Sequence, residues 1–201
     1  IPGYKAYFDK AFGENSMTVD NAAKAVAAFE RTLITPNSSY DKYVKGDNKA
    51  MSEQQVRGMN KFASSGCTSC HSGAAFNGPQ MKLGEGFFTR FPTFTDNTYV
   101  AQYKLADDKG RQEVTGNEAD ASMFRTPTLR NITDTAPYFH NGSVNDLAEA
   151  VRVMAKTQLN KDLPDSDVND IVAFLGALTG EYPEITMPRL PATSGTSIVA
   201  D

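Results

Sequence analysis

The sequence predicts a mainly α-helical fold, and three features support this prediction. Apolar residues recur at helical spacing in several separate segments, and no segment shows the sustained alternation that is typical of strands. Between residues 72 and 123 the helical periodicity disappears, leaving about 50 residues rich in Gly, Pro, Asn, Asp and Thr, far above the usual loop length. We expect this stretch to hold extended pieces or short strands and to pack against a large prosthetic group.

The helical pattern predicts helices over residues 4–12, 18–33, 52–65, 143–154 and 165–178. The first ends at Gly13, and the third begins with a capping-box pair, Ser52 and Gln55. In the fourth, we expect one apolar face to include Val144 and Met154. Residues 181–201 are rich in Pro, Ser and Thr and are expected to form an irregular tail.

Composition excludes several classes of protein. The chain has 201 residues, 40% of them hydrophobic, and a net charge of −4, which suits one domain or two small ones and excludes disorder for its bulk. No apolar run approaches the length of a membrane span. Without a block rich in Lys and Arg, nucleic-acid binding is not expected. Because the chain begins at Ile1 with no signal sequence before it, we expect a processed chain or a fragment.

The chemistry is concentrated in five residues that contain both cysteines of the chain. Cys67, Cys70 and His71 have the spacing of a c-type haem attachment site. Two thiols separated by two residues can each form a thioether to one of two vinyl groups on the same porphyrin edge. The adjacent His71 is then delivered to the iron as proximal ligand. Since this attachment occurs outside the cytoplasm, we expect a periplasmic protein.

Two other kinds of site also use a pair of cysteines at this spacing. A thioredoxin-like redox pair requires a βαβ context that the helical pattern does not supply. A zinc site requires further ligands, but there is no second Cys pair, and the other histidine, His140, lies far along the chain. Haem attachment is therefore favoured.

The second axial ligand decides between electron transfer and chemistry at an open iron. The downstream candidates are Met81, Met123, Met154 and Met187. Met81 is too close to His71 to cross the haem easily, and Met187 lies in the tail. Met123 and Met154 remain, although a Met at helical spacing is commonly core filler.

Several motifs together resemble the bacterial dihaem cytochrome c peroxidases, a family that includes the MauG-type enzymes. The motifs are FRTPTLRN at 124–131, TAPYFHNGS at 135–143, AVAAFERTL at 25–33, VRVM at 151–154 and IVAFL at 171–175. The resemblance covers nearly the whole chain but only the C-terminal part of the family's architecture. It implies a cytochrome c-like haem domain with long irregular loops around the haem.

The resemblance implies a role for each candidate residue. His71 and Met154 would bind the iron of the electron-accepting haem, and Met154 favours a peroxidase because MauG-like members have Tyr there. Further implied roles are an inter-haem position for His140, haem-propionate pairing for Arg125 or Arg130, and backbone carbonyl ligands for calcium from Thr135 and Pro137. A hard cation of this kind prefers oxygen ligands. No catalytic residue of the peroxidatic site is expected in this chain.

The resemblance also implies an organisation and partners. Residues 1–50 would be N-terminal helices of the inter-domain segment, 51–180 the c-type haem domain and 181–201 the tail. The complete enzyme would hold two haems c and calcium, reduce hydrogen peroxide to water, form a homodimer and take electrons from a small cytochrome c or cupredoxin. Its N-terminal peroxidatic haem domain is not in this sequence, so the chain alone is expected to be inactive. The alternatives are a stand-alone monohaem electron carrier and a MauG-like oxidase.

Overall fold

The computed structural model describes residues 1–82 and 84–191 and divides the chain into two compact units. Unit 1 contains residues 1–34 and the segment that starts at Tyr182, and unit 2 is Thr35–Glu181. Residues 182–191 contain no helix or strand, as expected for the tail. The rest of the predicted tail, 192–201, lies outside the described residues. No helix in the described part of the chain is both long and apolar enough to cross a membrane.

The described residues of unit 1 form two helices, α1 (Gly3–Phe12) and α2 (Val19–Glu30). The Thr18 side chain accepts a hydrogen bond from the Asn21 amide and caps α2, so the predicted start is confirmed. The helix ends at Glu30, short of the predicted Leu33. None of the residues in either helix is buried, and Phe29 is 50% exposed. The apolar pattern therefore predicted both helices correctly, but the apolar residues of these helices are not buried.

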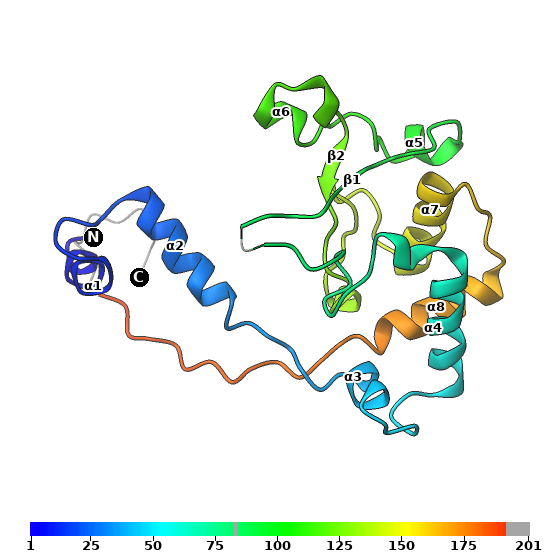
Figure 1. The fold of residues 1–201 in the computed structure, drawn as a ribbon, viewed down its shortest axis with the longest axis horizontal. Coiled ribbons are helices and arrows are strands. Elements are labelled where there is room, and N and C mark those ends of the chain that lie inside the picture. Colours follow the sequence, from blue (N-terminus) through cyan, green and yellow to red (C-terminus); the bar gives the residue numbers. More distant parts are fainter. Residues whose placement is uncertain (83, 192–201) are drawn as a thin grey trace. The chain divides into compact units, whose positions relative to one another are not determined.

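Unit 2 is built from short helices and one two-stranded sheet, and Figure 1 shows their arrangement. Its elements are α3 (Ser39–Val44), α4 (Glu53–Ser65), η1 (Cys67–Ser69), β1 (Phe88–Arg90), α5 (Thr98–Gln102), α6 (Gln112–Thr115), η2 (Glu118–Asp120), β2 (Met123–Arg125), η3 (Ile132–Asp134), α7 (Leu147–Leu159) and α8 (Asp165–Gly176). Strands β1 and β2 pair antiparallel, with Phe88 opposite Arg125. The expected mainly α fold with short strands in the middle is confirmed.

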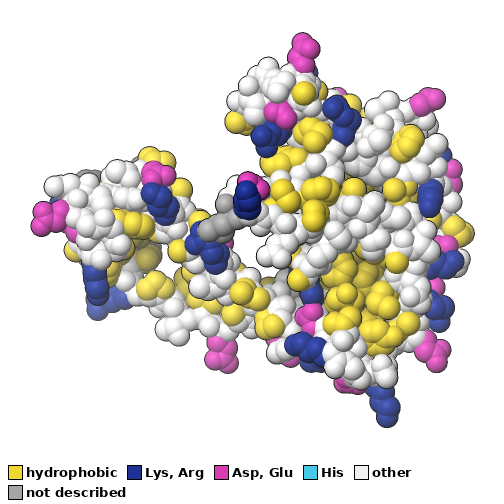
Figure 2. Space-filling model, viewed as in Figure 1, with side chains coloured by type: hydrophobic (Ala, Val, Ile, Leu, Met, Phe, Trp, Pro, Cys, Tyr) yellow, Lys and Arg dark blue, Asp and Glu magenta, His cyan; other side chains and the backbone are white. Residues whose placement is uncertain are grey.

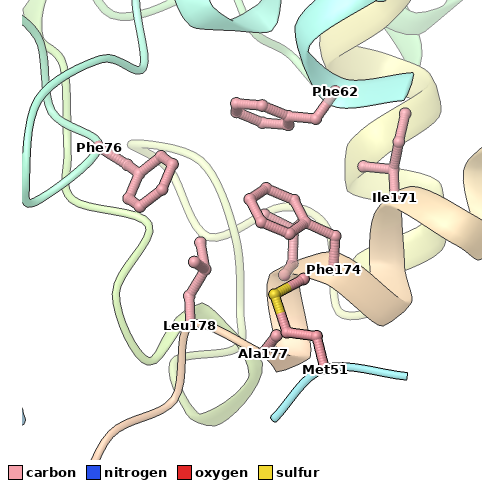
Figure 3. Close-up of a cluster of buried hydrophobic side chains, with 8 residues drawn as sticks. Met51, Phe62, Phe76, Ile171, Phe174, Ala177 and Leu178 are labelled. Carbon is pink, nitrogen blue, oxygen red and sulfur yellow. The ribbon is translucent and has the colours of Figure 1, made fainter. Parts of the chain in front are cut away.

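Helices α4 and α8 pack against each other in unit 2. The capping box predicted at Ser52 and Gln55 is present at the start of α4. Gly58 allows a close approach, because a Cβ atom there would lie 1.8 Å from the carbonyl oxygen of Asp170. A cluster of buried apolar side chains that includes Phe62, Phe76 and Phe174 fills the adjoining core (Figure 3).

Helix α7 begins later than the sequence pattern predicted. Asp146 is its N-cap and accepts a hydrogen bond from the Glu149 amide. Val144 therefore lies outside the helix, where it forms a bridge to Tyr138. The backbone bond from Tyr138 N to Val144 O competes with helix formation at that point. Helix α8 likewise ends at Gly176, two residues before the predicted Leu178.

Candidate functional site

A cavity of about 490 Å³ in unit 2 is lined by most of the site residues that the sequence singled out, Arg130 among them, but not by Met81, Met123 or Met187. The other site residues that line it are Cys67, Cys70, His71, Arg125, Thr135, Pro137, His140 and Met154. They come from η1 and the turn after it, β2, the loop around η3, and α7. On the visible face of unit 2, hydrophobic side chains gather and charged side chains lie mostly around the edge (Figure 2).

The end of α4 forms one wall of the cavity. Gly66 ends that helix with a φ of +99°, a left-handed conformation that favours glycine. The chain then turns into η1, where the amide of His71 donates to the carbonyl of Cys67 at 2.9 Å. This tight turn places both thiols and the His71 ring on the same wall.

The His71 ring is oriented by one backbone carbonyl. The side chain is buried, and Nδ1–H donates a hydrogen bond of 2.9 Å to the carbonyl oxygen of Phe76. A carbonyl can only accept, so the proton is on Nδ1 and Nε2 carries the free lone pair. Burial lowers the pKa of His71, and the hydrogen bond to Phe76 only partly opposes it. The ring is therefore a neutral imidazole, the form that binds a metal ion.

The environment of Cys67 argues against a redox dithiol. Burial raises the pKa of the Cys67 thiol to about 11. A thioredoxin-like pair works through a thiolate whose pKa is lowered, which is the opposite shift. Within residues 1–82 and 84–191, no group of three His, Cys, Asp or Glu side chains is placed to hold a metal ion, so a zinc site gains no support.

Met154 lies on α7 and lines the cavity, whereas Met123 at the start of β2 does not. Met154 packs against a buried cluster formed by Phe91, Leu105 and Val153. Its thioether sulfur is a soft donor of the kind that haem iron accepts. Of the two methionines left open by the sequence, the cavity contains Met154.

His140 lies in an aromatic group on the cavity. Its ring stacks on Phe124, with centroids 4.3 Å apart, and meets Phe91 edge-on at 5.8 Å. Desolvation by these surroundings lowers the pKa of His140, while the charge of Asp108 opposes the shift. His140 is therefore held mainly as a neutral ring at neutral pH.

The two arginines considered for propionate pairing have different surroundings. The guanidinium of Arg130 forms an ion pair with Asp41, with Nη2 2.8 Å from Oδ1. Arg125 is exposed on β2, where its backbone pairs with Phe88, and its guanidinium makes no hydrogen bond or ion pair with the described residues. Arg125 is thus the arginine of the cavity whose charge is left for a ligand. The sequence did not predict the Arg130–Asp41 pair. The spacing of Ser38 and Asp41 is a capping-box signal, but it indicates only the start of α3.

Thr135 and Pro137 are exposed residues that line the cavity. Within the described part of the chain, neither of their carbonyl oxygens accepts a backbone hydrogen bond. Both oxygens are therefore available as ligands of a hard cation such as calcium.

The cavity fits a c-type haem. Its volume lies in the range of cofactor and ligand pockets. Two thiols, an imidazole with a free Nε2 and a thioether all line it, next to aromatic rings and one unpaired guanidinium. The remaining surroundings are largely apolar side chains such as Phe91, Ile132 and Leu159, which suit a porphyrin.

The architecture defines a class of protein, a mainly helical cytochrome c-like fold. Among solved structures, a MauG-like protein associated with microbial copper homeostasis has a similar fold, with a TM-score of 0.66, 25% identity and coverage of 89% of this chain and 59% of that protein. The model of the family described as di-haem cytochrome c peroxidase matches residues 1–49.

Curated relatives extend the similarity over nearly the whole sequence. Cytochrome c551 peroxidase of Nitrosomonas europaea is 40% identical over 96% of this chain and 54% of its own length. The protein of the same name from Pseudomonas aeruginosa is 42% identical over 98% and 55%. The methylamine utilization protein MauG of Methylophilus methylotrophus is 28% identical over 95% and 56%.

The chain belongs to the dihaem cytochrome c peroxidase family. It spans about half the length of the curated relatives it matches. The activity of the whole protein is therefore treated below as a proposal.

Proposed function

We propose that this chain is the electron-transfer haem domain of a periplasmic dihaem cytochrome c peroxidase, which reduces hydrogen peroxide to water. The observation that carries the proposal is the convergence of Cys67, Cys70, His71 and Met154 on one cavity. The proposed haem domain, residues 51–180, then lies within unit 2, and residues 1–50 belong to the inter-domain segment.

Four residues of the cavity would hold the haem. Cys67 and Cys70 would bind it through thioethers, while His71 Nε2 and the Met154 thioether would bind its iron. When bound, the haem supplies one-electron redox chemistry, and methionine ligation raises its potential. The orientation of His71 by the Phe76 carbonyl fixes the tautomer that this ligand set needs.

Three further roles are those that the resemblance implies for residues lining the cavity. The unpaired guanidinium of Arg125 is suited to a haem propionate through charge-assisted hydrogen bonds. The free carbonyls of Thr135 and Pro137 are suited to a calcium ion. The resemblance gives His140, whose ring stacks on Phe124, a role between the two haems of a complete enzyme.

The proposal divides labour between two domains. Residues 66–159 supply one haem site, and the family resemblance assigns peroxide reduction to a separate N-terminal haem domain. A small cytochrome c or cupredoxin would deliver electrons to this chain, and the complete enzyme would be a homodimer. The names of the two cytochrome c551 peroxidases support a cytochrome as donor.

The test is a turnover assay on the haem-loaded chain with hydrogen peroxide and a reduced cytochrome. We expect the chain to take up electrons from the cytochrome but to show almost no steady-state peroxide reduction. Robust turnover by these 201 residues alone would contradict the division of labour. Failure to accept electrons from any small donor would contradict the electron-transfer role.

A MauG-like oxidase is the second candidate, because the chain resembles MauG proteins in sequence and a MauG-like protein in fold. The residue at position 154 separates the two. Methionine there favours the peroxidase, since the resemblance places tyrosine at this position in MauG-like members. Absence of the long-wavelength band typical of methionine-ligated ferric haem would favour the oxidase.

A further inference from the structure

Arg130 connects α3 to the loop that follows the Cys67–His71 turn. Its Nη1 and Nη2 donate to both carboxylate oxygens of Asp41 at 3.0 and 2.8 Å, and Nη1 also donates to Ser38 Oγ at 3.0 Å. On the other side, Nε donates to the carbonyl oxygen of Ala74 at 2.9 Å. The Arg130 and Asp41 side chains are only 17% and 18% exposed. Because the guanidinium is rigid and bonded on both sides, it fixes the distance between α3 and residue 74.

The neighbouring carbonyl is held from the same segment. Thr128 Oγ1 donates to the carbonyl oxygen of Ala75 at 2.6 Å, and the Leu129 amide donates to the same oxygen at 3.3 Å. Thr128 Oγ1 also accepts from the Arg130 amide at 3.1 Å. Residues 128–130 thus hold two successive carbonyls, and the next carbonyl along the chain is that of Phe76, which accepts the His71 Nδ1–H.

Phe76 needs this support from its surroundings. Its φ of +53° lies in the left-handed region, which is unfavourable for a bulky residue. The Phe76 ring is buried beside Tyr40 and Phe62, and the Arg130 guanidinium carbon lies 5.6 Å from the ring centroids of both Phe76 and Tyr40. Packing therefore holds the ring, while the bonds at residues 74 and 75 hold the backbone leading to its carbonyl.

We propose that Arg130, fixed by Asp41, is a positioning residue for the axial ligand His71 and acts through the carbonyls of residues 74–76. This inference rests on the proposed function, because it requires His71 to bind haem iron. A fixed carbonyl on Nδ1–H makes the imidazole a stronger donor and so favours oxidised iron. Loosening the carbonyl therefore shifts the reduction equilibrium toward the reduced form.

The test uses two variants that keep the charge of the site. Arg130→Lys retains the positive charge but loses the planar fork, and Thr128→Val removes one bond to Ala75 with little change in shape. Arg57→Lys is the matched control, because Arg57 pairs with Asp170 between α4 and α8 and does not bond to residues 74–76. Two quantities are measured on the haem-loaded chain: the midpoint potential, and the solvent-exchange rate of the His71 Nδ1 proton by NMR in the reduced state.

We expect Arg130→Lys to shift the reduction equilibrium about tenfold toward the reduced form, which is 59 mV for one electron, and to speed proton exchange at Nδ1. Thr128→Val should move both quantities in the same direction, while Arg57→Lys leaves both unchanged. If Arg130→Lys and Thr128→Val both keep wild-type values, the positioning role is wrong and the proposed function stands. If the wild-type chain binds no His-ligated haem, both the proposed function and this inference are overturned.

Discussion

The two walls of the cavity are held by different forces. The His71 wall, residues 66–76, is fixed by hydrogen bonds: His71 Nδ1–H to Phe76 O at 2.9 Å and the His71 amide to Cys67 O at 2.9 Å. The Met154 wall is α7 and the cluster of Phe91, Leu105 and Val153, where Met154 is held by packing alone. Hydrogen bonds fix direction, while apolar packing is non-directional.

The two kinds of constraint indicate which of the two proposed ligands is easier to displace. His71 cannot turn without losing a buried hydrogen bond, whereas Met154 can move as far as its neighbours allow. Its flexible thioether adapts readily to new packing. We therefore expect the His71 ligand to survive changes that remove the Met154 ligand.

The strongest effect is expected when the two thiols that would attach the haem to the His71 wall are removed. Replacing Cys67 and Cys70 together by Ser should abolish covalent haem attachment, because no other thiol exists in the chain. Haem staining after denaturing electrophoresis, together with intact mass, measures the loss. Ser64→Ala is the control, since Ser64 donates to the Lys61 carbonyl on α4 and does not line the cavity, and it should keep the haem. Haem retained covalently by the double variant would contradict the assignment.

The next prediction concerns the thioether on the Met154 wall. Met154→Leu nearly conserves volume and should cost less than about 1.5 kcal/mol of stability, yet it removes the thioether. We expect the long-wavelength methionine band to vanish and the midpoint potential to fall. Met59→Leu, in the core beside α8, should leave both unchanged. A Met154→Leu protein that keeps the band would show that another residue is the ligand.

Truncating a buried side chain behind one wall at a time tests whether the two ligands respond differently. Phe174→Ala, behind Phe76, should lower the free energy of unfolding by about 3–5 kcal/mol, and Leu105→Ala, behind Met154, by about 2–5 kcal/mol. Only Leu105→Ala should also weaken the methionine band. Denaturant unfolding and the ferric spectrum measure the two effects. Val114→Ala, 89% exposed, is the control and should change stability by less than about 0.5 kcal/mol.

A smaller effect concerns pH and the support of the His71 wall. Burial alone would raise the pKa of Asp41, but hydrogen bonds from Arg130 and Ser38 outweigh it and hold the pKa below its ordinary value of 3.8. A lowered carboxyl pKa adds stability that is present above that ordinary value and is lost as the pH falls through the folded-state pKa. We therefore expect Asp41→Asn to reduce stability at neutral pH and to flatten its loss in acid.

The measurement is the free energy of unfolding at a series of pH values down to about 2. Asp162→Asn is the control, because the carboxylate that pairs with Lys156 is 81% exposed and such pairs contribute little. An Asp41→Asn protein with the wild-type acid profile would show that the pair with Arg130 adds nothing to stability.

Local signals in the sequence predicted those features that depend on neighbouring residues. The capping box of α4 and the spacing of Cys67, Cys70 and His71 are both read within a few residues, and the structure has the predicted capping box. The late start of α7 was missed because Val144 bonds to Tyr138 rather than continuing a helix, and the early end of α2 was missed as well.

Features that depend on contacts across the chain could not be predicted. Arg130 was considered for a haem propionate, but tertiary packing brings it to Asp41 on α3, a helix that the periodicity did not reveal. The carbonyl that orients His71 has no side-chain signal, because any residue at position 76 presents one. Residue spacing left Met123 and Met154 open, and the resemblance implied Met154; in the structure Met154 lines the cavity and Met123 does not.

The most direct test of the central claim is the spectrum and intact mass of the wild-type chain produced with haem-maturation machinery. We expect a mass increased by one covalently bound haem and a low-spin ferric spectrum with the methionine band. A chain without covalent haem, or a haem-bound chain with a high-spin ferric spectrum lacking that band, would contradict the pairing of His71 with Met154.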